Sequence, residues 1–310
     1  MPAPRPGWGR ADPMPDSLFR SLDLTLTHCH PADGAVMMWL HERALAAERA
    51  ALGMDRRPLG LFIRDMDGVI QAGAVLWLYG PDAYIHVLWV DAPWRGKRLG
   101  AALLVAAENA AVAAGTNRLY LSTMGFQGAD FYPRYGFESQ GVFADFTRGH
   151  DRHYFSKTPL TASPSLPLPP GLFLHRAEAP DAADIAAVEN GLDAHWYLTI
   201  PDPYTEITVQ AVDGAGTRVA AGLAVLDGAY LTLVDLQTDP DWRGKGVGRQ
   251  VLGELERLGA EAGCCWATVM PMSYQSPDFF VHLGYARRMR VENYLLGQGR
   301  DWLRRAIGDE

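Results

Sequence analysis

The sequence contains an internal repeat with a constant offset of 148 residues, and this feature restricts the possible folds more than any other. The region from Asp91 to Gly136 recurs from Asp239 to Gly284 without a gap. One register over this length indicates a duplicated domain, because similar composition alone does not align residue types. The identical pairs include Asp91/Asp239, Trp94/Trp242, Arg95/Arg243, Gly96/Gly244, Lys97/Lys245, Gly100/Gly248, Leu104/Leu252, Glu108/Glu256, Gly115/Gly263, Gln127/Gln275, Asp130/Asp278, Phe131/Phe279 and Gly136/Gly284.

A Pro-rich segment separates the two copies. Residues 159–171 contain five prolines, and proline disfavours both helices and central strands. We therefore expect one domain over residues 21–158, a stiff linker over 159–171 and a second domain over 172–310. Residues 1–20 are Pro-rich and polar, and we expect them to form a disordered tail.

Composition excludes several classes of protein. The chain is 48% hydrophobic and 21% charged, which is typical of a soluble globular protein, and no apolar run is long enough to span a membrane. The net charge of −8 argues against nucleic-acid binding. Cys29, Cys264 and Cys265 lack metal-site spacing, so we expect reduced thiols and no metal. A cytoplasmic monomer or homodimer is the expectation.

Each copy predicts the same order of elements. A helix (34–52 or 180–191) is followed by two strands, and in the first copy these are residues 61–64 and 69–77. A further strand (84–90 or 230–238) then leads through a Gly-rich turn into a long helix (99–114 or 247–262). A strand (118–123 or 266–270), a short helix and a closing strand complete the unit. This order predicts an α/β fold, with a mixed sheet in a three-layer arrangement.

The turn between strand and long helix has the composition of a phosphate-binding loop. Glycines let several backbone N–H groups approach one anion, and the helix that follows adds its unpaired first-turn amides. One such turn is usually only a tight connection, but the chain has it twice in the same context. The candidate residues are Leu88, Val90, Arg95, Gly96, Lys97, Arg98, Leu99 and Gly100 in the first copy, and Leu236, Thr238, Arg243, Gly244, Lys245, Gly246, Val247 and Gly248 in the second.

These loops resemble the Arg/Gln-x-x-Gly-x-Gly/Ala signature of the GNAT superfamily of acyl-CoA N-acyltransferases. Residues 130–137 (DFYPRYGF) and 278–285 (DFFVHLGY) resemble a later motif of that family. The resemblance implies two tandem GNAT domains. It also implies that acetyl-CoA or another acyl-CoA is the co-substrate, with its pyrophosphate on the Gly-rich loop, and that an amine is acylated.

The two copies depart from the family pattern at different positions. In the first copy Arg98 stands where the family has glycine, and it can still offer its backbone N–H if its φ is negative. In the second copy the loop is intact, but Phe280 replaces the tyrosine that many family members use. Tyr132 retains that tyrosine in the first copy.

Acylation of an amine needs a base, an oxyanion site and a donor to the leaving thiolate. An alkylamine with a pKa of about 10.4 is neutral in only roughly one molecule in 2,500 at pH 7, so a base is required. His86 is the candidate base, because the same spacing before the loop carries a histidine in aralkylamine acetyltransferases. Tyr132 is the candidate acid, and strand N–H groups near Leu88 suit an oxyanion. In the second copy Asp235 is a weaker base candidate, because alternation predicts that it lies on the opposite sheet face from the position of His86, and Tyr274 is a weaker donor.

The acceptor pocket is expected to involve the first helical region, as in the GNAT family. Its candidate residues are His28, His30, Met38, Trp39, His41 and Glu42, with His150 and His153 as further candidates. The prediction is an N-acetyltransferase of a small-molecule primary amine, active in the first domain. The alternatives are a non-catalytic acyl-CoA sensor, a protein lysine acetyltransferase, and an enzyme active in its C-terminal domain, as in the similar tandem arrangement of mycothiol synthase.

Overall fold

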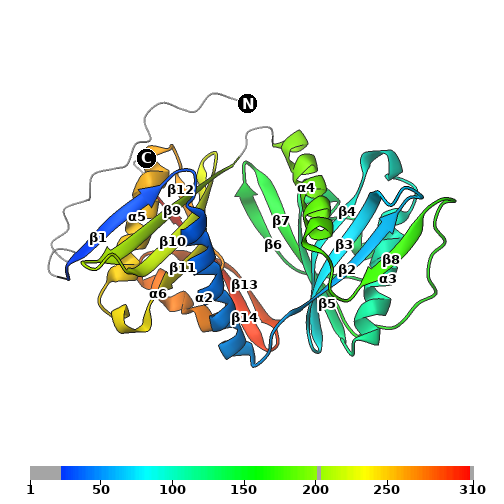
Figure 1. Cartoon of the computed structure of the whole chain (residues 1–310), viewed down its shortest axis with the longest axis horizontal. Helices are drawn as coiled ribbons and strands as arrows, with labels where there is room; N and C mark the ends of the chain where they lie inside the picture. Colours follow the sequence, from blue (N-terminus) through cyan, green and yellow to red (C-terminus); the bar gives the residue numbers. More distant parts are fainter. Residues whose placement is uncertain (1–21, 201–203, 308–310) are drawn as a thin grey trace. The chain divides into compact units, whose positions relative to one another are not determined.

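The structure of the protein is a computed structural model that describes residues 22–200 and 204–307 (Figure 1). The tail predicted for residues 1–20 lies outside these described residues. The chain divides into two compact units, and neither follows one copy of the repeat. Unit 1 comprises Met1–Ala51, Pro203–Arg290 and Arg300–Glu310, and unit 2 comprises Leu52–Asp202 and Val291–Gly299.

Unit 2 is built around a seven-stranded sheet with the order β6-β7-β5-β4-β3-β2-β8. Antiparallel pairing dominates, and β4 and β5 form a parallel pair. Its elements are β2 (Arg57–Arg64), β3 (Ile70–Tyr79), β4 (Asp82–Val90), η1 (Ala92–Trp94), α3 (Leu99–Ala113), β5 (Arg118–Met124), η2 (Gly125–Gln127), η3 (Tyr132–Tyr135), β6 (Glu138–Thr147), β7 (His150–Lys157), β8 (Phe173–Ala177) and α4 (Ala182–Thr199).

Unit 1 repeats this plan, with the sheet order β1-β9-β10-β11-β12-β14-β13. Each copy of the sequence closes with two strands, whereas the sequence predicted one. The elements are β1 (Leu24–Cys29), α2 (Gly34–Leu52), β9 (Thr205–Asp213), β10 (Arg218–Asp227), β11 (Tyr230–Thr238), η4 (Pro240–Trp242), α5 (Val247–Glu261), β12 (Trp266–Val269), η5 (Ser273–Gln275), α6 (Pro277–His282), β13 (Ala286–Leu295) and β14 (Gln298–Ala306).

The two copies of the repeat exchange their first strand and helix. β1 pairs antiparallel with β9, with Leu24 opposite Asp213, and β8 pairs antiparallel with β2, with Phe173 opposite Arg64. The predicted helices near 34–52 and 180–191 are therefore present, but α2 covers the sheet of the second copy and α4 covers the sheet of the first. Figure 1 shows β8 beside β2 and α4 against the same sheet.

Helices cover both faces of each sheet, so each unit has the predicted three layers. In unit 2 the apolar side of α3 packs against β2, β3 and β4 in one core cluster. Alternate residues of the same strands, Phe62, Val75 and Val87, pack against Val188 of α4 on the other face. The contact with α4 is close, because a Cβ at Gly191 would lie 2.4 Å from the Trp89 ring.

The predicted linker packs along unit 2. Residues 159–171 form no helix or strand, as expected from their prolines. Leu160 is buried and Leu168 packs against the α3 core. Asn109 exchanges two hydrogen bonds of 2.8 Å with the backbone of Ser163. The segment is therefore held against the helix that follows the Gly-rich loop.

The parallel strand pair of each unit separates part of the way along its length. In unit 2 the β4–β5 pairing ends at Ile85 and Leu121 although both strands continue. In unit 1 the β11–β12 pairing ends at Leu233 and Val269. Among the described residues, the later parts of β4 and β11 therefore have one edge without a strand partner. In unit 2 this part of β4 lies near the Gly-rich loop, because a Cβ at Gly100 would be 3.8 Å from Val90 and 4.0 Å from Leu88.

A β-bulge lies where each pair opens. The pairing of β3 with β4 passes from Leu76↔Ile85 to Val75↔Val87, so His86 is the extra residue, and Val234 is the extra residue in β11. A bulge interrupts alternation, so His86 and Val87 both face α4. The predicted opposite orientation of Asp235 is wrong for this reason, because Asp235 lies near His41 of α2, on the corresponding face.

Candidate functional site

The Gly-rich loops of the two units have the same backbone conformation. Gly96 and Gly244 have φ of 75° and 73°, and the residues that precede the long helices, Arg98 and Gly246, have φ of 66° and 80°. The negative φ considered for Arg98 is therefore not what the structure contains. Arg98 adopts the left-handed conformation that normally requires glycine, so the loop keeps its shape despite the substitution.

Both loops place positive charge at a helix end that has no side-chain cap. Neither Arg98 nor Gly246 caps its helix with a side-chain hydrogen bond, so first-turn N–H groups of α3 and α5 are available to an anion. Lys97 and Lys245 lie over the rings of Trp94 and Trp242 at 4.4 and 4.8 Å. This arrangement fits the pyrophosphate of coenzyme A.

The two loop arginines are tied to the end of the central strand. Arg95 Nε donates to the carbonyl of Val90 and Arg243 Nε donates to that of Thr238, each at 3.0 Å. The last glycines of the loops differ in their surroundings. A Cβ at Gly248 would lie 2.9 Å from Thr238 Oγ1, whereas one at Gly100 would meet Phe131 at 3.7 Å. The loop of unit 1 therefore requires its last glycine more strictly.

The candidate base His86 is joined to a carboxylate that the sequence did not indicate. His86 Nε2 lies 2.8 Å from Oε1 of Glu189 on α4, and both side chains are more than a third exposed. A carboxylate accepts hydrogen bonds, so Nε2 carries the proton and Nδ1 is the nitrogen free to act as a base. The imidazole also contacts Trp77, with ring centroids 5.4 Å apart.

The candidate acid Tyr132 is buried in the core cluster on the α3 face of the sheet. It begins η3 and packs against Phe155 and Phe137. Burial, with a smaller contribution from Tyr84, raises the pKa of its phenol above the ordinary value. Tyr132 is therefore protonated at neutral pH and able to donate a hydrogen bond.

Helix α4 contributes three more side chains to this region. The Arg95 guanidinium lies 3.4 Å from His195 Nδ1, and burial followed by the charge of Arg95 lowers the pKa of His195, so the ring is neutral and accepts. Trp196 stacks edge-on with Phe126, which also contacts His150. Partial burial and then Glu189 raise the pKa of Asp193.

The sequence did not indicate these α4 residues, because it looked for the acceptor pocket in the first helical region. Chain order suggested residues 28–42, yet His28, His41 and their neighbours belong to unit 1. There His28 lies 3.5 Å from Glu254, and Trp39 stacks under Arg43. The available signal was the repeat itself, because α4 follows the linker as α2 follows the tail.

A polar network continues from β4 across the opening. The Tyr84 hydroxyl lies 3.2 Å from Ser122 Oγ, and Arg152 donates to the same Oγ from Nε and Nη2 at 3.3 and 3.0 Å. Ser122 and Arg152 lie on β5 and β7, on the sheet face opposite α3. His153 lies on the other face, where its ring stacks on Phe155.

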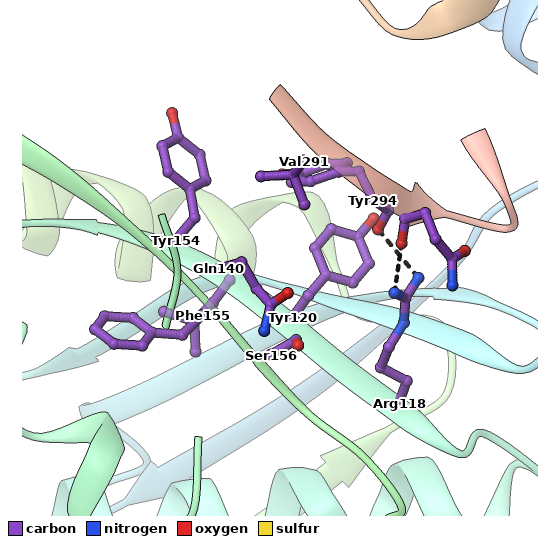
Figure 2. A pocket seen from close by; sticks show the side chains of 10 residues that line it. Arg118, Tyr120, Gln140, Tyr154, Phe155, Ser156, Val291 and Tyr294 are labelled. Carbon is purple, nitrogen blue, oxygen red and sulfur yellow. Dashed lines mark hydrogen bonds between the residues drawn. The ribbon is translucent and has the colours of Figure 1, made fainter. Parts of the chain in front are cut away.

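The tip of the β13–β14 hairpin closes one end of this face (Figure 2). Arg118 binds both carboxylate oxygens of Asp82 and donates to the carbonyls of Asn293 and Tyr294, while Tyr120 packs edge-on against Tyr294. The cavity between them is about 10 Å³, which suffices for at most one water molecule. It is therefore a packing defect and not a substrate pocket.

Unit 1 lacks the corresponding side chains. Phe280, buried where unit 2 has Tyr132, has no hydroxyl, and the exposed bulge residue Val234 takes the position of His86. Asp235 is the carboxylate residue on β11, and burial raises the pKa of its carboxyl group against the opposing effects of Gln237 and His41. Tyr274 lies in η5, at the position of Phe126.

No group of three or more His, Cys, Asp or Glu side chains within residues 22–200 and 204–307 could hold a metal ion. In the same ranges, no helix has both the length and the apolar character needed to cross a membrane. The free thiols Cys29, Cys264 and Cys265 form no disulfide.

Comparison with known proteins identifies the family. The acetyltransferase (GNAT) family matches residues 25–137 and again residues 177–285. The acetyltransferase Atu2258 of Agrobacterium fabrum is 28% identical over 127 residues, which is 41% of this chain and 93% of that protein.

Two solved structures illustrate the same likeness. An acetyltransferase from Bacillus cereus is 20% identical, with a TM-score of 0.37, 42% of this chain covered and 96% of that one. The aminoglycoside 6'-N-acetyltransferase of Enterococcus faecium is 16% identical, with a TM-score of 0.32 and coverages of 38% and 82%. Because the family match is duplicated and spans most of the sequence, the chain belongs to the GNAT family and is a tandem acyl-CoA-dependent N-acetyltransferase.

Proposed function

We propose that unit 2 acetylates the primary amine of a small molecule and that His86 and Tyr132 are its catalytic residues. The observation that carries this proposal is that unit 2 combines an imidazole on β4 where the strand pair opens, a buried phenol packed on Phe155 of β7, and an uncapped phosphate loop after β4. In unit 1 the corresponding opening has the loop without the imidazole or the phenol.

Each of these groups has a defined task in the reaction. The amine loses one proton to His86 Nδ1, and its nitrogen then forms a bond to the acyl carbon while the carbon–sulfur bond breaks. Of the two protons that the ammonium loses overall, one ends on the sulfur and the other reaches solvent through His86. Tyr132 donates a hydrogen bond to the departing sulfur, and we assign the backbone near Leu88 and Val90 to the carbonyl oxygen.

The loop residues Arg95, Gly96, Lys97, Arg98, Leu99 and Gly100 would hold the pyrophosphate in unit 2, and Arg243, Gly244, Lys245, Gly246, Val247 and Gly248 would do so in unit 1. Leu236 and Thr238 are the strand residues of unit 1 that correspond to Leu88 and Val90. Unit 1 then binds acyl-CoA without turnover or serves as a structural partner.

Helix α4 covers the proposed acceptor face of unit 2, and this cover supports a small acceptor. Helix α4 packs on Trp89 at Gly191 and reaches Phe126 through Trp196. A narrow amine fits beneath such a cover more readily than a lysine presented by a folded protein surface. Peptide lysine is therefore the second acceptor class to test.

The test is thiol release from acetyl-CoA with a panel of small amines and lysine peptides. We expect His86→Gln to lower kcat/KM by roughly 10²-fold or more, the usual worth of a general base, and Tyr132→Phe to lower kcat without weakening acetyl-CoA binding. Asp235→Asn and Phe280→Tyr are the matched variants of unit 1, and we expect both to leave turnover unchanged.

Three outcomes would contradict the proposal. Tight binding of coenzyme A with no turnover of any amine would favour an acyl-CoA sensor. A loss of activity in Asp235→Asn but not in His86→Gln would place the chemistry in unit 1. Turnover of peptides alone would replace the small-molecule acceptor with a protein.

A further inference from the structure

Arg152 is a half-buried cation on the acceptor face of unit 2, and no acidic side chain among the described residues pairs with it. Its interactions within the described part of the chain are the two hydrogen bonds to Ser122 Oγ and a stacking contact with Phe146 at 5.0 Å. Two other arginines of the same sheet are paired differently, because Arg64 of β2 binds Asp184 and Arg118 of β5 binds Asp82. A guanidinium has five N–H donors, so most of those of Arg152 remain available.

The position of Arg152 connects it to the proposed catalytic base. Ser122 Oγ links Arg152 to the Tyr84 hydroxyl at 3.2 Å, and the Tyr84 ring lies 6.4 Å from the His86 ring. Arg152 and His86 therefore lie on the same sheet face, on the β7 and β4 sides of the opening, with the Tyr84 and Ser122 side chains between them.

The other side of the opening carries negative charge. Glu189 binds His86, and Asp193 lies one helical turn further along α4, where it forms no ion pair with any described residue. A cationic amine is attracted to this side, whereas an anionic group is attracted to Arg152. The α4 side thus has two carboxylates, together with Arg56 over the Trp77 ring and Arg95 beside His195, and the other side has Arg152.

We propose that Arg152 binds a carboxylate on the acceptor, so that the substrate of unit 2 is an amine that also carries a carboxylate. This inference rests on the proposed function of unit 2. The amine lies at His86 and Glu189, and the carboxylate accepts from the guanidinium fork of Arg152, which suits planar anions. Because Tyr84 and Ser122 lie between the two groups, the acceptor has several carbon atoms between nitrogen and carboxylate.

Unit 1 provides an internal comparison. The positions of Tyr84, Ser122 and Arg152 in the repeat are occupied by Thr232, Met270 and Arg300. Arg300 Nε donates to the backbone carbonyl of Met270, and Met270 has no hydroxyl group that could accept from a guanidinium as Ser122 does. The carboxylate site is therefore specific to the unit that has the candidate base and acid.

The experiment compares amines that differ only in the carboxylate. Kinetics are measured for ω-amino acids from glycine to 6-aminohexanoate and for n-alkylamines of matching length, with wild type, Arg152→Gln and Arg176→Gln. Arg176 is an exposed arginine on β8 that pairs with Glu178, so its variant is the control for loss of charge. We expect Arg152→Gln to raise KM at least tenfold for the preferred amino acid and to leave KM for the matching alkylamine within twofold.

A second measurement keeps this test separate from that of the proposed function. Calorimetry with the preferred amino acid, or with 6-aminohexanoate if none is turned over, reports carboxylate binding to wild type and Arg152→Gln in the presence of coenzyme A. Turnover of alkylamines and amino acids with equal KM, unaffected by Arg152→Gln, would overturn the carboxylate site alone. The absence of any turnover would overturn the proposed function, and binding lost in Arg152→Gln would still establish the anion site.

Discussion

At the scale of single residues, Arg98 shows how a loop can keep its function-bearing shape after losing a glycine. A residue with a Cβ in the left-handed region costs about 1–2 kcal/mol, and Arg98 occupies this region at the start of α3. The arginine also places a positive charge at the N-terminus of α3, beside the backbone amides that are proposed to bind phosphate.

Arg98→Gly should therefore stabilise unit 2 and lower its affinity for coenzyme A. Relief of the backbone strain, less the entropic cost of glycine, predicts a gain of about 0.5–1 kcal/mol, which thermal unfolding can detect. Loss of the charge should raise the Kd for coenzyme A, measured by calorimetry. Gly246→Arg is the reciprocal variant and should destabilise unit 1, and an unchanged midpoint in both variants would contradict the strain argument.

Tyr132 should contribute no alkaline limb to the pH–rate profile below pH 10. Burial raises its pKa, so the protonated form that donates to sulfur persists to a pH above the ordinary value of about 10. Tyr132→Phe should accordingly lower kcat by a similar factor at every pH from 6 to 9.5. A wild-type rate that falls with a midpoint near pH 8, with the fall absent in Tyr132→Phe, would contradict this assignment.

At the scale of elements, the packing of α4 on β4 determines the positions of the side chains in the candidate site. Gly191 lies against the Trp89 ring and Gly73 of β3 lies against Val188, each so closely that a Cβ would be within 2.5 Å of its neighbour. Two glycines thus let α4 approach the sheet, and this approach brings Glu189 to His86. The strand bulge contributes the other half of the geometry, because it turns His86 toward α4.

Gly191→Ala should destabilise unit 2 and reduce its activity. The added methyl group overlaps a rigid ring, and overpacking of this kind costs about 1–3 kcal/mol, which exceeds the gain in helix propensity. Gly253→Ala is a matched control, because Gly253 lies in α5 with open space around it and should stabilise by up to about 1 kcal/mol. Unfolding of both variants in urea and their kcat values provide the measurement.

The same elements show how far the sequence predicts this molecule. The strands near 84–90 and 230–238, the long helices and both loops follow from local patterns, and the structure contains them. The bulge at His86 cannot be predicted from the sequence, because one unpaired residue leaves no periodic signal. The same kind of bulge makes the alternation argument for Asp235 fail. The sheet that each first helix covers does not follow either, because an apolar helix face is equally compatible with either sheet.

The residues of the candidate site also fall into those that the sequence predicts and those that it does not. The loop residues and Tyr132 could be predicted from motifs, because the chemistry of each depends on its immediate neighbours in the chain. Glu189 and Arg152 could not, because they reach the face of β4 through α4 and β7. Their positions depend on tertiary pairing between segments about 100 and 66 residues from His86.

At the scale of the whole molecule, the exchange of β1–α2 for β8–α4 makes each unit depend on both copies of the repeat. Without β8 and α4, the β2 edge and the side chains of Phe62, Val75 and Val87 lose their cover. Uncovered sheet edges and apolar faces promote aggregation.

Separate fragments of residues 1–165 and 166–310 should therefore be unstable alone and should complement each other when co-expressed. We expect each fragment alone to elute as an aggregate in size-exclusion chromatography and to show little protection in hydrogen exchange. The co-expressed fragments should elute as a 1:1 complex with acetyltransferase activity. A soluble, protected 1–165 fragment, in which β1 takes the place of β8, would contradict the exchange.

This exchange has an evolutionary consequence. After a gene duplication, a copy that loses its own chemistry is normally free to be discarded. Here the copy with Phe280 and Val234 supplies the helix that aligns Glu189 with its histidine in the other copy. The second copy is thereby needed for the site proposed in unit 2, because deletion of residues 172–310 would remove Glu189 and its helix.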